Sequence, residues 1–271
     1  MNPLADAARR LTAVSDTPLL DAELLLAHAL GIDREQLLLS PPDEIPAEFD
    51  ALLARRLAGE PIAYIVGTRA FWTIELEVAP GVLIPRPDSE TLMDAAVAHF
   101  RGTAGPTRVL DLGTGSGALL LAALDQWRQA TGLGIDSSEA ALAIAQRNAI
   151  RLGMAERAEF RVADWADGIT ERFDLILCNP PYVATSALLG PGVVDHEPHE
   201  ALFAGDDGLD ALRALGPQIP HLLAPGGLAA VEIGYDQAVP AATLFTRDGL
   251  AARLARDLAC RPRALLLTKA C

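Results

Sequence analysis

The residues best suited to chemistry form a short polar segment, Asn179-Pro180-Pro181-Tyr182, which directly follows the apolar run DLILC. A primary amide or exocyclic amine attacks poorly because its nitrogen lone pair is delocalised, so an enzyme must hold both N–H donors and aim the nitrogen. The side-chain carbonyl of Asn179 and the backbone carbonyl of Pro180 are suited to accept those hydrogens, and Tyr182 would cover one face of the planar group. A simple turn explains the prolines but not the flanking Asn and Tyr. The segment therefore predicts a pocket that orients a planar nitrogen nucleophile.

A glycine-rich segment, Gly113-Thr114-Gly115-Ser116-Gly117, lies between the apolar run RVLDL and the helical run ALLLAALDQW. Glycines at a strand-to-helix junction let the backbone approach a ligand closely, and the helix N-terminus adds oriented N–H groups. The segment predicts a nucleotide-type site.

The glycines alone do not identify the ligand. Gly113, Gly115 and Ala118 also fit the dinucleotide pattern G-x-G-x-x-A, with Asp136 about twenty residues further on. Asp111 favours S-adenosylmethionine over a nicotinamide dinucleotide, because a carboxylate there suits a cationic amino group and repels a pyrophosphate. Asp136 offers two acceptor oxygens to ribose hydroxyls with either ligand.

The pair Asp164-Trp165 follows a third apolar run, EFRV, and is predicted to contact an adenine. The carboxylate can accept from the exocyclic amine and the indole can cover the ring face. A capping Asp and a packed Trp are the structural alternative.

Two other features suggest chemistry less strongly. Cys178 precedes the Asn-Pro-Pro-Tyr segment, but nitrogen methylation needs no covalent intermediate, so no nucleophile is predicted there. The segment 195–200 contains His196 and His199, but Pro198 prevents a regular helix from presenting them together. We therefore predict no metal site and expect a solvated or site-covering loop.

The elements that must position these residues follow from periodicity. From Asp88 onward short apolar runs alternate with helical stretches, which predicts an α/β fold of the Rossmann-like type with a mostly parallel sheet. In such sheets the carboxyl ends of the strands bind ligands. The expected strands are 108–112, 132–135, 159–162, 174–178 and 227–233, with a terminal antiparallel pair at 252–257 and 264–269.

The chain before Asp88 is predicted to be a small helical unit followed by a rigid linker. Thr17-Pro18 begins one helix and Gly31 ends it, and another runs through AEFDALLARRLAG. The extended runs 71–78 and 82–85, separated by Ala79-Pro80-Gly81, predict a β-hairpin. We expect a helical substrate-recognition domain at 1–68, the linker at 69–87 and a catalytic domain at 88–271.

Composition limits the partners. A formal charge of −14 disfavours nucleic acid, because binding to its backbone depends on basic groups. The sequence has no apolar run of about 18 residues and its N-terminus does not resemble a secretory signal, so a cytoplasmic protein without membrane attachment is expected. The three cysteines, Cys178, Cys260 and Cys271, lack metal spacing and fit a reducing compartment.

With these residues assembled, the chain resembles the release factor glutamine methyltransferases, the HemK/PrmC family, over nearly its full length. The matching segments are GEPIAYIVG (59–67), FWTIELEV (71–78), LIPRPDSE (83–90), DLGTGSG (111–117), GID (134–136), AQRNA (145–149), DW (164–165), HEP-x-x-AL (196–202), GDDGLD (205–210) and LAPGGLAAVEIG (223–234). Several of them lie outside the cofactor-binding region, which makes the resemblance specific.

The resemblance implies a class I methyltransferase fold with seven strands, S-adenosylmethionine as donor and S-adenosylhomocysteine as product. The implied substrate is the glutamine of the Gly-Gly-Gln loop of class I peptide release factors, with the helical unit helping to hold the factor. Independently of the resemblance, we expect a monomer. By the same resemblance residues 113–117, Asp136 and Trp165 contact the cofactor, and residues 179–182 form the glutamine pocket. One departure is Cys260, where the family is expected to carry glycine, and it leaves the geometry of the final hairpin open.

Two alternatives remain at this point. An adenine-N6 nucleic-acid methyltransferase would also use an Asn-Pro-Pro-Tyr type pocket, on a flipped base. A non-catalytic adaptor could retain the fold and bind partners through residues 1–60.

Overall fold

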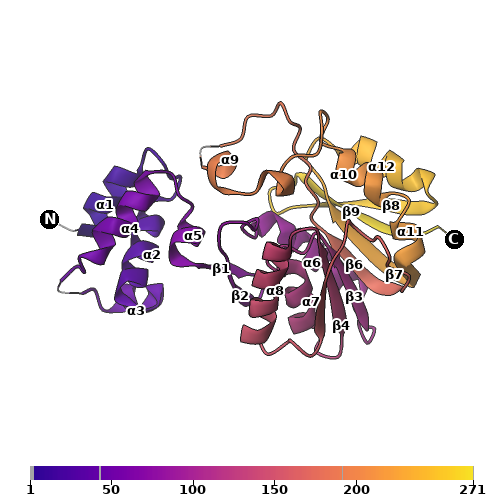
Figure 1. The fold of residues 1–271 in the computed structure, drawn as a ribbon, viewed down its shortest axis with the longest axis horizontal. Helices are drawn as coiled ribbons and strands as arrows, with labels where there is room; N and C mark the ends of the chain where they lie inside the picture. Colours follow the sequence, from indigo (N-terminus) through magenta and orange to yellow (C-terminus); the bar gives the residue numbers. More distant parts are fainter. Residues whose placement is uncertain (1–2, 43, 191, 271) are drawn as a thin grey trace. The chain divides into compact units, whose positions relative to one another are not determined.

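The structure, a computed structural model, describes residues 3–42, 44–190 and 192–270, which form two compact units (Figure 1). The smaller unit contains the chain up to Thr68 together with Val78–Pro80 and Leu188–Glu197. The larger unit contains Arg69–Glu77, Gly81–Ala187 and the chain from Pro198 onward. Cys271 lies outside the described residues.

The smaller unit is helical, as predicted. Pro18 stands at the first turn of α2, and Gly31, with a φ of 64°, ends that helix in the left-handed conformation that glycine adopts readily. The buried Asp21 carboxylate accepts from Arg56 Nε at 2.8 Å and so joins α2 to α4. The helices of this unit are α1 (Pro3–Leu11), α2 (Pro18–Leu30), α3 (Arg34–Leu39), α4 (Glu48–Leu57), α5 (Ile62–Val66) and α9 (Val193–His196).

A two-stranded hairpin follows α5, but it differs from the predicted one. Strands β1 (Thr68–Phe71) and β2 (Ile74–Glu77) pair with each other, so the chain reverses at Trp72-Thr73 and not at residues 79–81. Trp72 adopts a positive φ of 54°, which is uncommon for a bulky residue, so the sequence does not indicate a turn at this position. Residues 82–85 form no strand. Their apolar character reflects burial of Val82, Ile84 and Pro85 rather than strand pairing.

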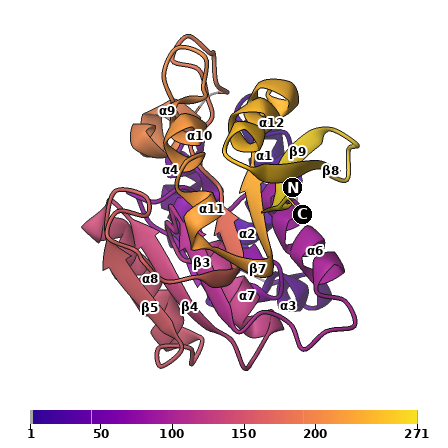
Figure 2. The same cartoon turned by 90° about the vertical axis from the view of Figure 1, so that its right-hand side faces the viewer.

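The larger unit is built on a seven-stranded sheet with the order β5-β4-β3-β6-β7-β9-β8 (Figure 2). The first five strands in this order pair in parallel, and β9 pairs antiparallel with both β7 and β8. This arrangement confirms the predicted mostly parallel sheet with a terminal antiparallel pair. The strands are β3 (Arg108–Leu112), β4 (Thr131–Asp136), β5 (Ala158–Val162), β6 (Phe173–Cys178), β7 (Leu223–Glu232), β8 (Leu250–Arg256) and β9 (Pro262–Lys269).

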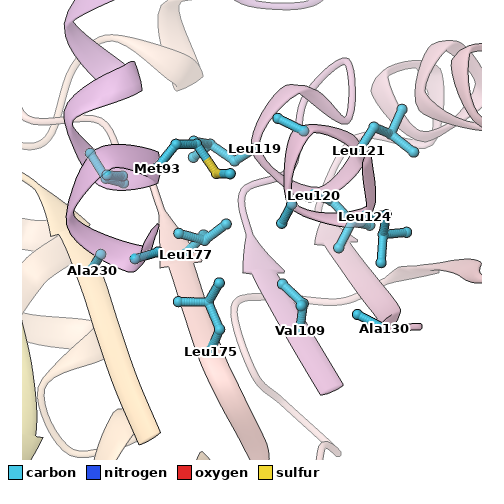
Figure 3. Packing of buried hydrophobic residues seen from close by; sticks show 14 of the residues in the cluster. Met93, Val109, Leu119, Leu120, Leu121, Leu124, Ala130, Leu175, Leu177 and Ala230 are labelled. Atoms are coloured by element: carbon cyan, nitrogen blue, oxygen red, sulfur yellow. The ribbon is translucent and has the colours of Figure 1, made fainter. Parts of the chain in front are cut away.

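Helices cover both faces of this sheet, because neighbouring residues along each strand point to opposite sides. On β6, Leu175 and Leu177 belong to one core and Ile176 belongs to the other. Figure 3 shows the first core, in which Met93 and Leu120 pack over β3 and β6. This face carries α6 (Glu90–His99), α7 (Ala118–Gln126) and α8 (Glu139–Arg151), and the opposite face carries α10 (Asp210–Leu215), α11 (Ile219–Leu222) and α12 (Ala238–Arg247). Two short 3₁₀ turns are η1 (Pro87–Ser89) and η2 (His199–Ala201).

The final hairpin forms with Cys260 in its turn. This residue is exposed and has a φ of 61°, the left-handed conformation for which glycine is the usual choice. Asp257 closes the turn, because its backbone N–H donates to the Arg261 carbonyl and its carboxylate accepts from the Arg261 N–H. Cysteine at this position therefore keeps the geometry of a glycine turn.

No helix in the part of the chain that the structure describes is long and apolar enough to cross a membrane.

Candidate active site

The glycine-rich loop leaves the carboxyl end of β3 and leads into α7. The backbone N–H groups of Gly113 and Thr114 both donate to the carbonyl of Ile135 at the end of β4, at 2.9 and 2.8 Å. Gly117 has a φ of 85°, and a Cβ on it would lie 3.0 Å from Leu121 Cδ1. Glycine at 117 thus permits the turn and the close packing of the first helical turn.

Asp111, near the end of β3, is a buried carboxylate with one oxygen unsatisfied. Its Oδ2 accepts from Thr114 Oγ1 at 2.7 Å and from the Leu120 N–H at 3.2 Å, while its Oδ1 has no hydrogen-bond partner. Burial raises the pKa of Asp111 to about 7. The residue lines a small cavity together with Arg86, Ser89 and Asn179. An unpaired buried carboxylate oxygen in such a place is suited to a cationic donor from a ligand.

A larger cavity of about 600 Å³ lies beside the small one and shares Leu83, Gly113, Gly115 and Asn179 with it. Its volume is typical of small-molecule sites, which supports one extended ligand across both cavities. The residues lining the larger cavity include Gly81, Val82, Asp136, Ser137, Ser138, Asp164, Trp165, Pro181, Pro198 and Glu200.

Asp136 holds the loops around this cavity and also faces it. Its Oδ2 accepts from the Gly115 N–H at 2.8 Å, and its Oδ1 accepts from the Ser138 N–H at 2.9 Å. Each carboxylate oxygen has a second lone pair, so a ligand diol can still bind.

Asp164 and Trp165 lie on the same cavity, as the sequence predicts for an adenine contact. Asp164 is exposed and Trp165 is half-buried. Trp165 has a φ of 50°, an uncommon conformation for a bulky residue. Such backbone strain is concentrated at ligand sites in proteins.

Asn179 follows β6 and lines both cavities. Its side-chain Nδ2 donates to Ser89 Oγ at 3.1 Å. Pro181 lines the larger cavity. Pro180 is buried, and it lines neither cavity.

Tyr182 lies outside the lining residues of the two cavities and is engaged in a buried contact. Its hydroxyl donates to Glu232 Oε1 at 3.1 Å, and burial together with that carboxylate raises the pKa of Tyr182. Thr114 and Ser116 are buried beside the small cavity, whereas Gly117 is not part of either lining.

Sequence reasoning missed Glu232, Ser89 and Arg86. Glu232 is fully buried at the end of β7, its Oε2 accepts from Ser89 Oγ at 2.6 Å, and burial raises its pKa to about 7. A signal was present, because an acid within the apolar run GLAAVEI is unusual in a central strand. Ser89 and Arg86 carry no such signal in their surroundings.

The alternatives to direct methyl transfer at this site are a cysteine nucleophile and a metal ion. Cys178 is fully buried, and burial raises the pKa of its thiol, which disfavours the nucleophilic thiolate. In residues 3–42, 44–190 and 192–270, no group of three or more His, Cys, Asp or Glu side chains is arranged to hold a metal ion.

The sheet order, the glycine-rich loop after β3 and the cavities at the carboxyl ends of the strands define a class I, S-adenosylmethionine-dependent methyltransferase. Residues 105–244 match a methyltransferase domain family, and residues 3–67 match the PrmC N-terminal domain. Among relatives, the chain is 44% identical over 259 residues to the release factor glutamine methyltransferase of Rhodospirillum rubrum, covering 93% of this chain and 79% of that protein. It is 42% identical to that of Caulobacter vibrioides, covering 94% of this chain and 90% of that protein. The chain belongs to the release factor glutamine methyltransferase family.

Solved structures agree with the fold. A methyltransferase from Pyrococcus furiosus aligns with a TM-score of 0.57 at 18% identity, covering 83% of this chain and 100% of that one. A 16S rRNA methyltransferase from T. thermophilus, in complex with AdoMet and guanosine, aligns with a TM-score of 0.54 at 21% identity, covering 75% of this chain and 50% of that one.

Proposed function

We propose that this chain methylates the side-chain amide nitrogen of the glutamine in the Gly-Gly-Gln motif of class I peptide release factors, and that Asn179 orients that amide. The observation that carries the proposal is the state of the Asn179 side chain. Ser89 binds its Nδ2, which leaves Oδ1 as an acceptor on a residue that lines both cavities.

The cavities offer groups that fit S-adenosylmethionine. The unpaired Oδ1 of Asp111 suits the ammonium group of the ligand, and Arg86 on the same small cavity suits its carboxylate. Asp136, which lines the larger cavity, suits the ribose hydroxyls. Asp164 and Trp165 line the same cavity and suit the adenine amine and ring face.

When bound, S-adenosylmethionine supplies a sulfonium methyl group to a nucleophile. Asn179 Oδ1 and the Pro180 carbonyl accept the two N–H groups of the substrate amide, so that its nitrogen faces the methyl donor. Tyr182 lines neither cavity but adjoins Pro181, which does, and in this proposal its ring covers one face of the amide. No general base is needed, since the methylated nitrogen can lose its proton after transfer.

The same contacts supply selectivity for an amide. A substrate without the NH₂ group leaves the Asn179 and Pro180 acceptors unpaired, which costs about 1–3 kcal/mol for each. An ester or a carboxylate of similar shape is therefore a poor substrate.

The remaining parts of the proposal concern the partner. The helical segment 1–68 recognises the release factor, residues 69–87 form the linker, and residues 88–271 carry the chemistry. The chain acts as a monomer in the cytoplasm, where translation termination takes place. The relatives' names support the release factor as substrate.

Two substitutions separate the proposed roles. Asn179→Ala removes the orienting acceptor together with the donor to Ser89, so S-adenosylmethionine binding should stay within about twofold while kcat falls by roughly 100-fold. Asp136→Ala removes the ribose acceptor and should weaken cofactor binding by about tenfold or more. Calorimetry gives the binding constants and a labelled-methyl assay gives kcat. Equal losses of cofactor affinity in both variants would refute the role of Asn179, and unchanged binding by Asp136→Ala would refute the ribose contact.

A further inference from the structure

A chain of hydrogen bonds links the Asn-Pro-Pro-Tyr segment to a buried carboxylate on another strand. Asn179 Nδ2 donates to Ser89 Oγ at 3.1 Å, and Ser89 Oγ donates to Glu232 Oε2 at 2.6 Å. Tyr182 donates its hydroxyl to the other oxygen of Glu232 at 3.1 Å. Glu232 therefore binds, directly or through Ser89, two of the side chains in the substrate segment.

The direction of the Ser89 hydroxyl proton in this hydrogen-bond chain determines the orientation of the Asn179 side-chain amide. The Ser89 hydroxyl has one proton and directs it to the Glu232 carboxylate, so toward Asn179 it can act only as an acceptor. An acceptor at Ser89 selects the Nδ2 side of the Asn179 amide and leaves Oδ1 for the substrate. The flipped amide would require the Ser89 proton, and Glu232 Oε2 would then lose its donor in a fully buried position.

An ion pair does not explain why the Glu232 carboxylate is buried. The nearby cation is Arg263 of β9, whose guanidinium lies 2.9 Å from Asp88 and 3.1 Å from Asp257. Neither of these two carboxylates belongs to the hydrogen-bond chain from Asn179 to Tyr182. The hydrogen bonds that Glu232 accepts from Ser89 and Tyr182 come from neutral hydroxyls. A buried carboxylate with this set of partners costs stability, which favours a functional role over a structural one.

We propose that Glu232 is a positioning residue, whose carboxylate acts through Ser89 to hold the Asn179 amide with Oδ1 toward the substrate and holds Tyr182 beside it. The inference rests on the proposed function, because it assigns the orientation that amide methylation requires.

The role requires the ionised form of Glu232. Protonation would place a donor on the carboxyl group, which frees the Ser89 proton to turn toward Asn179 and lets the amide flip. Burial raises the pKa of Glu232 to about 7, with Asp88 raising it further and Ser89, Tyr182 and Arg263 opposing. Since the carboxylate is the active form, kcat should fall as the pH drops through about 7.

The test compares wild type with Glu232→Gln, assayed for transfer from S-adenosylmethionine to a class I release factor. The glutamine side chain can accept from only one of Ser89 and Tyr182 and must present its NH₂ to the other, so one of the two partners is misplaced. We expect a kcat lower by roughly 10- to 100-fold at pH 8, unchanged cofactor affinity and loss of the kcat decrease near pH 7. With the donor saturating, its ammonium group keeps Asp111 ionised across this range, so that residue does not mimic the effect.

Two further variants make the assignment specific. Ser89→Ala should lower kcat with unchanged cofactor affinity, because it breaks the link from Glu232 to Asn179. Ser89→Thr keeps the hydroxyl and should restore most of the activity lost in Ser89→Ala. Asp174→Asn is the matched control, since Asp174 is a carboxylate in β6 that accepts from Thr107 and the Arg108 N–H, away from both cavities.

The outcomes separate the two proposals. A Glu232→Gln enzyme with normal kcat and an unchanged pH profile would overturn the positioning role alone. A loss of cofactor affinity in Glu232→Gln parallel to its loss of kcat would also overturn it by indicating general structural damage. A wild-type enzyme that binds the donor but leaves the release factor unmethylated would overturn the proposed function and this inference with it.

Discussion

Binding of S-adenosylmethionine should change the charge state of Asp111 more than that of any other single residue. Burial raises its pKa to about 7 from an ordinary value of 3.8, and its unpaired Oδ1 faces the place proposed for an ammonium group. A cation there favours the ionised carboxylate, so cofactor affinity should increase as the pH rises through about 7. The stability of the free protein should follow the opposite trend. Its folded state retains a proton that the unfolded chain has lost, so this residue lowers stability progressively between about pH 4 and pH 7.

We predict that Asp111→Asn separates these two effects. The variant should bind S-adenosylmethionine about tenfold or more weakly, without the pH dependence, yet its free form should be more stable than wild type at pH 8. Calorimetry across pH 6 to 8 and urea unfolding of the free protein are the measurements. Asp94→Asn, an exposed position on α6, controls for the loss of one negative charge. A less stable Asp111→Asn protein at pH 8 would contradict the account of the buried carboxylate.

Residue type and position in the sequence were enough to select Asp111, Asp136 and Asn179 as residues of one site. They lie at or directly after the carboxyl ends of β3, β4 and β6, which must meet at one edge of a parallel sheet, and the structure brings them to the same pair of cavities. Such reasoning could not predict that Ser89 and Glu232 belong to the same site. They are 143 positions apart, and their hydrogen bond depends on how η1 lies over β7.

At the level of elements, Asn148 of α8 connects three parts of the larger unit. Its Nδ2 donates to the carbonyls of Glu77 and Ser116, and its Oδ1 accepts from the Glu77 N–H. The side chain is fully buried. Strand β2, helix α8 and the glycine-rich loop are thereby held together by one amide.

We predict that Asn148→Ala lowers the free energy of unfolding by about 2–4 kcal/mol, because it leaves buried backbone groups without partners. Cofactor affinity should also fall, since the variant loosens the loop that contains Ser116. Urea unfolding and calorimetry measure the two effects. The matched control is Gln146→Ala, an exposed amide on the same helix, which should change stability by less than about 0.5 kcal/mol. Similar destabilisation by both variants would contradict the proposed connection.

Element types were predictable where the apolar pattern is continuous, and less so at turns. The strand β3 was predicted to the residue, and the others within a few positions, because buried parallel strands are near-continuous apolar runs. The hairpin was misplaced because its turn uses Trp72 and Thr73 rather than the glycine and proline nearby. Burial of Val82 and Ile84 imitated a strand pattern without strand pairing.

At the level of the whole molecule, the fold does not by itself define the substrate. The similar structures include an rRNA methyltransferase, so the same fold occurs in an enzyme named for a nucleic-acid substrate. The net charge of −14 disfavours a nucleic-acid substrate. The helical domain matched at 3–67 and the full-length relatives favour a protein substrate.

The most direct test of this account is transfer of labelled methyl from S-adenosylmethionine to a bacterial class I release factor, beside a factor whose Gly-Gly-Gln glutamine is replaced by alanine. We predict label on the wild-type factor and none on the variant, which would establish donor, substrate and target residue together. Label on neither factor, with donor binding demonstrated, or equal label on both, would contradict the assignment of the glutamine amide as the methyl acceptor.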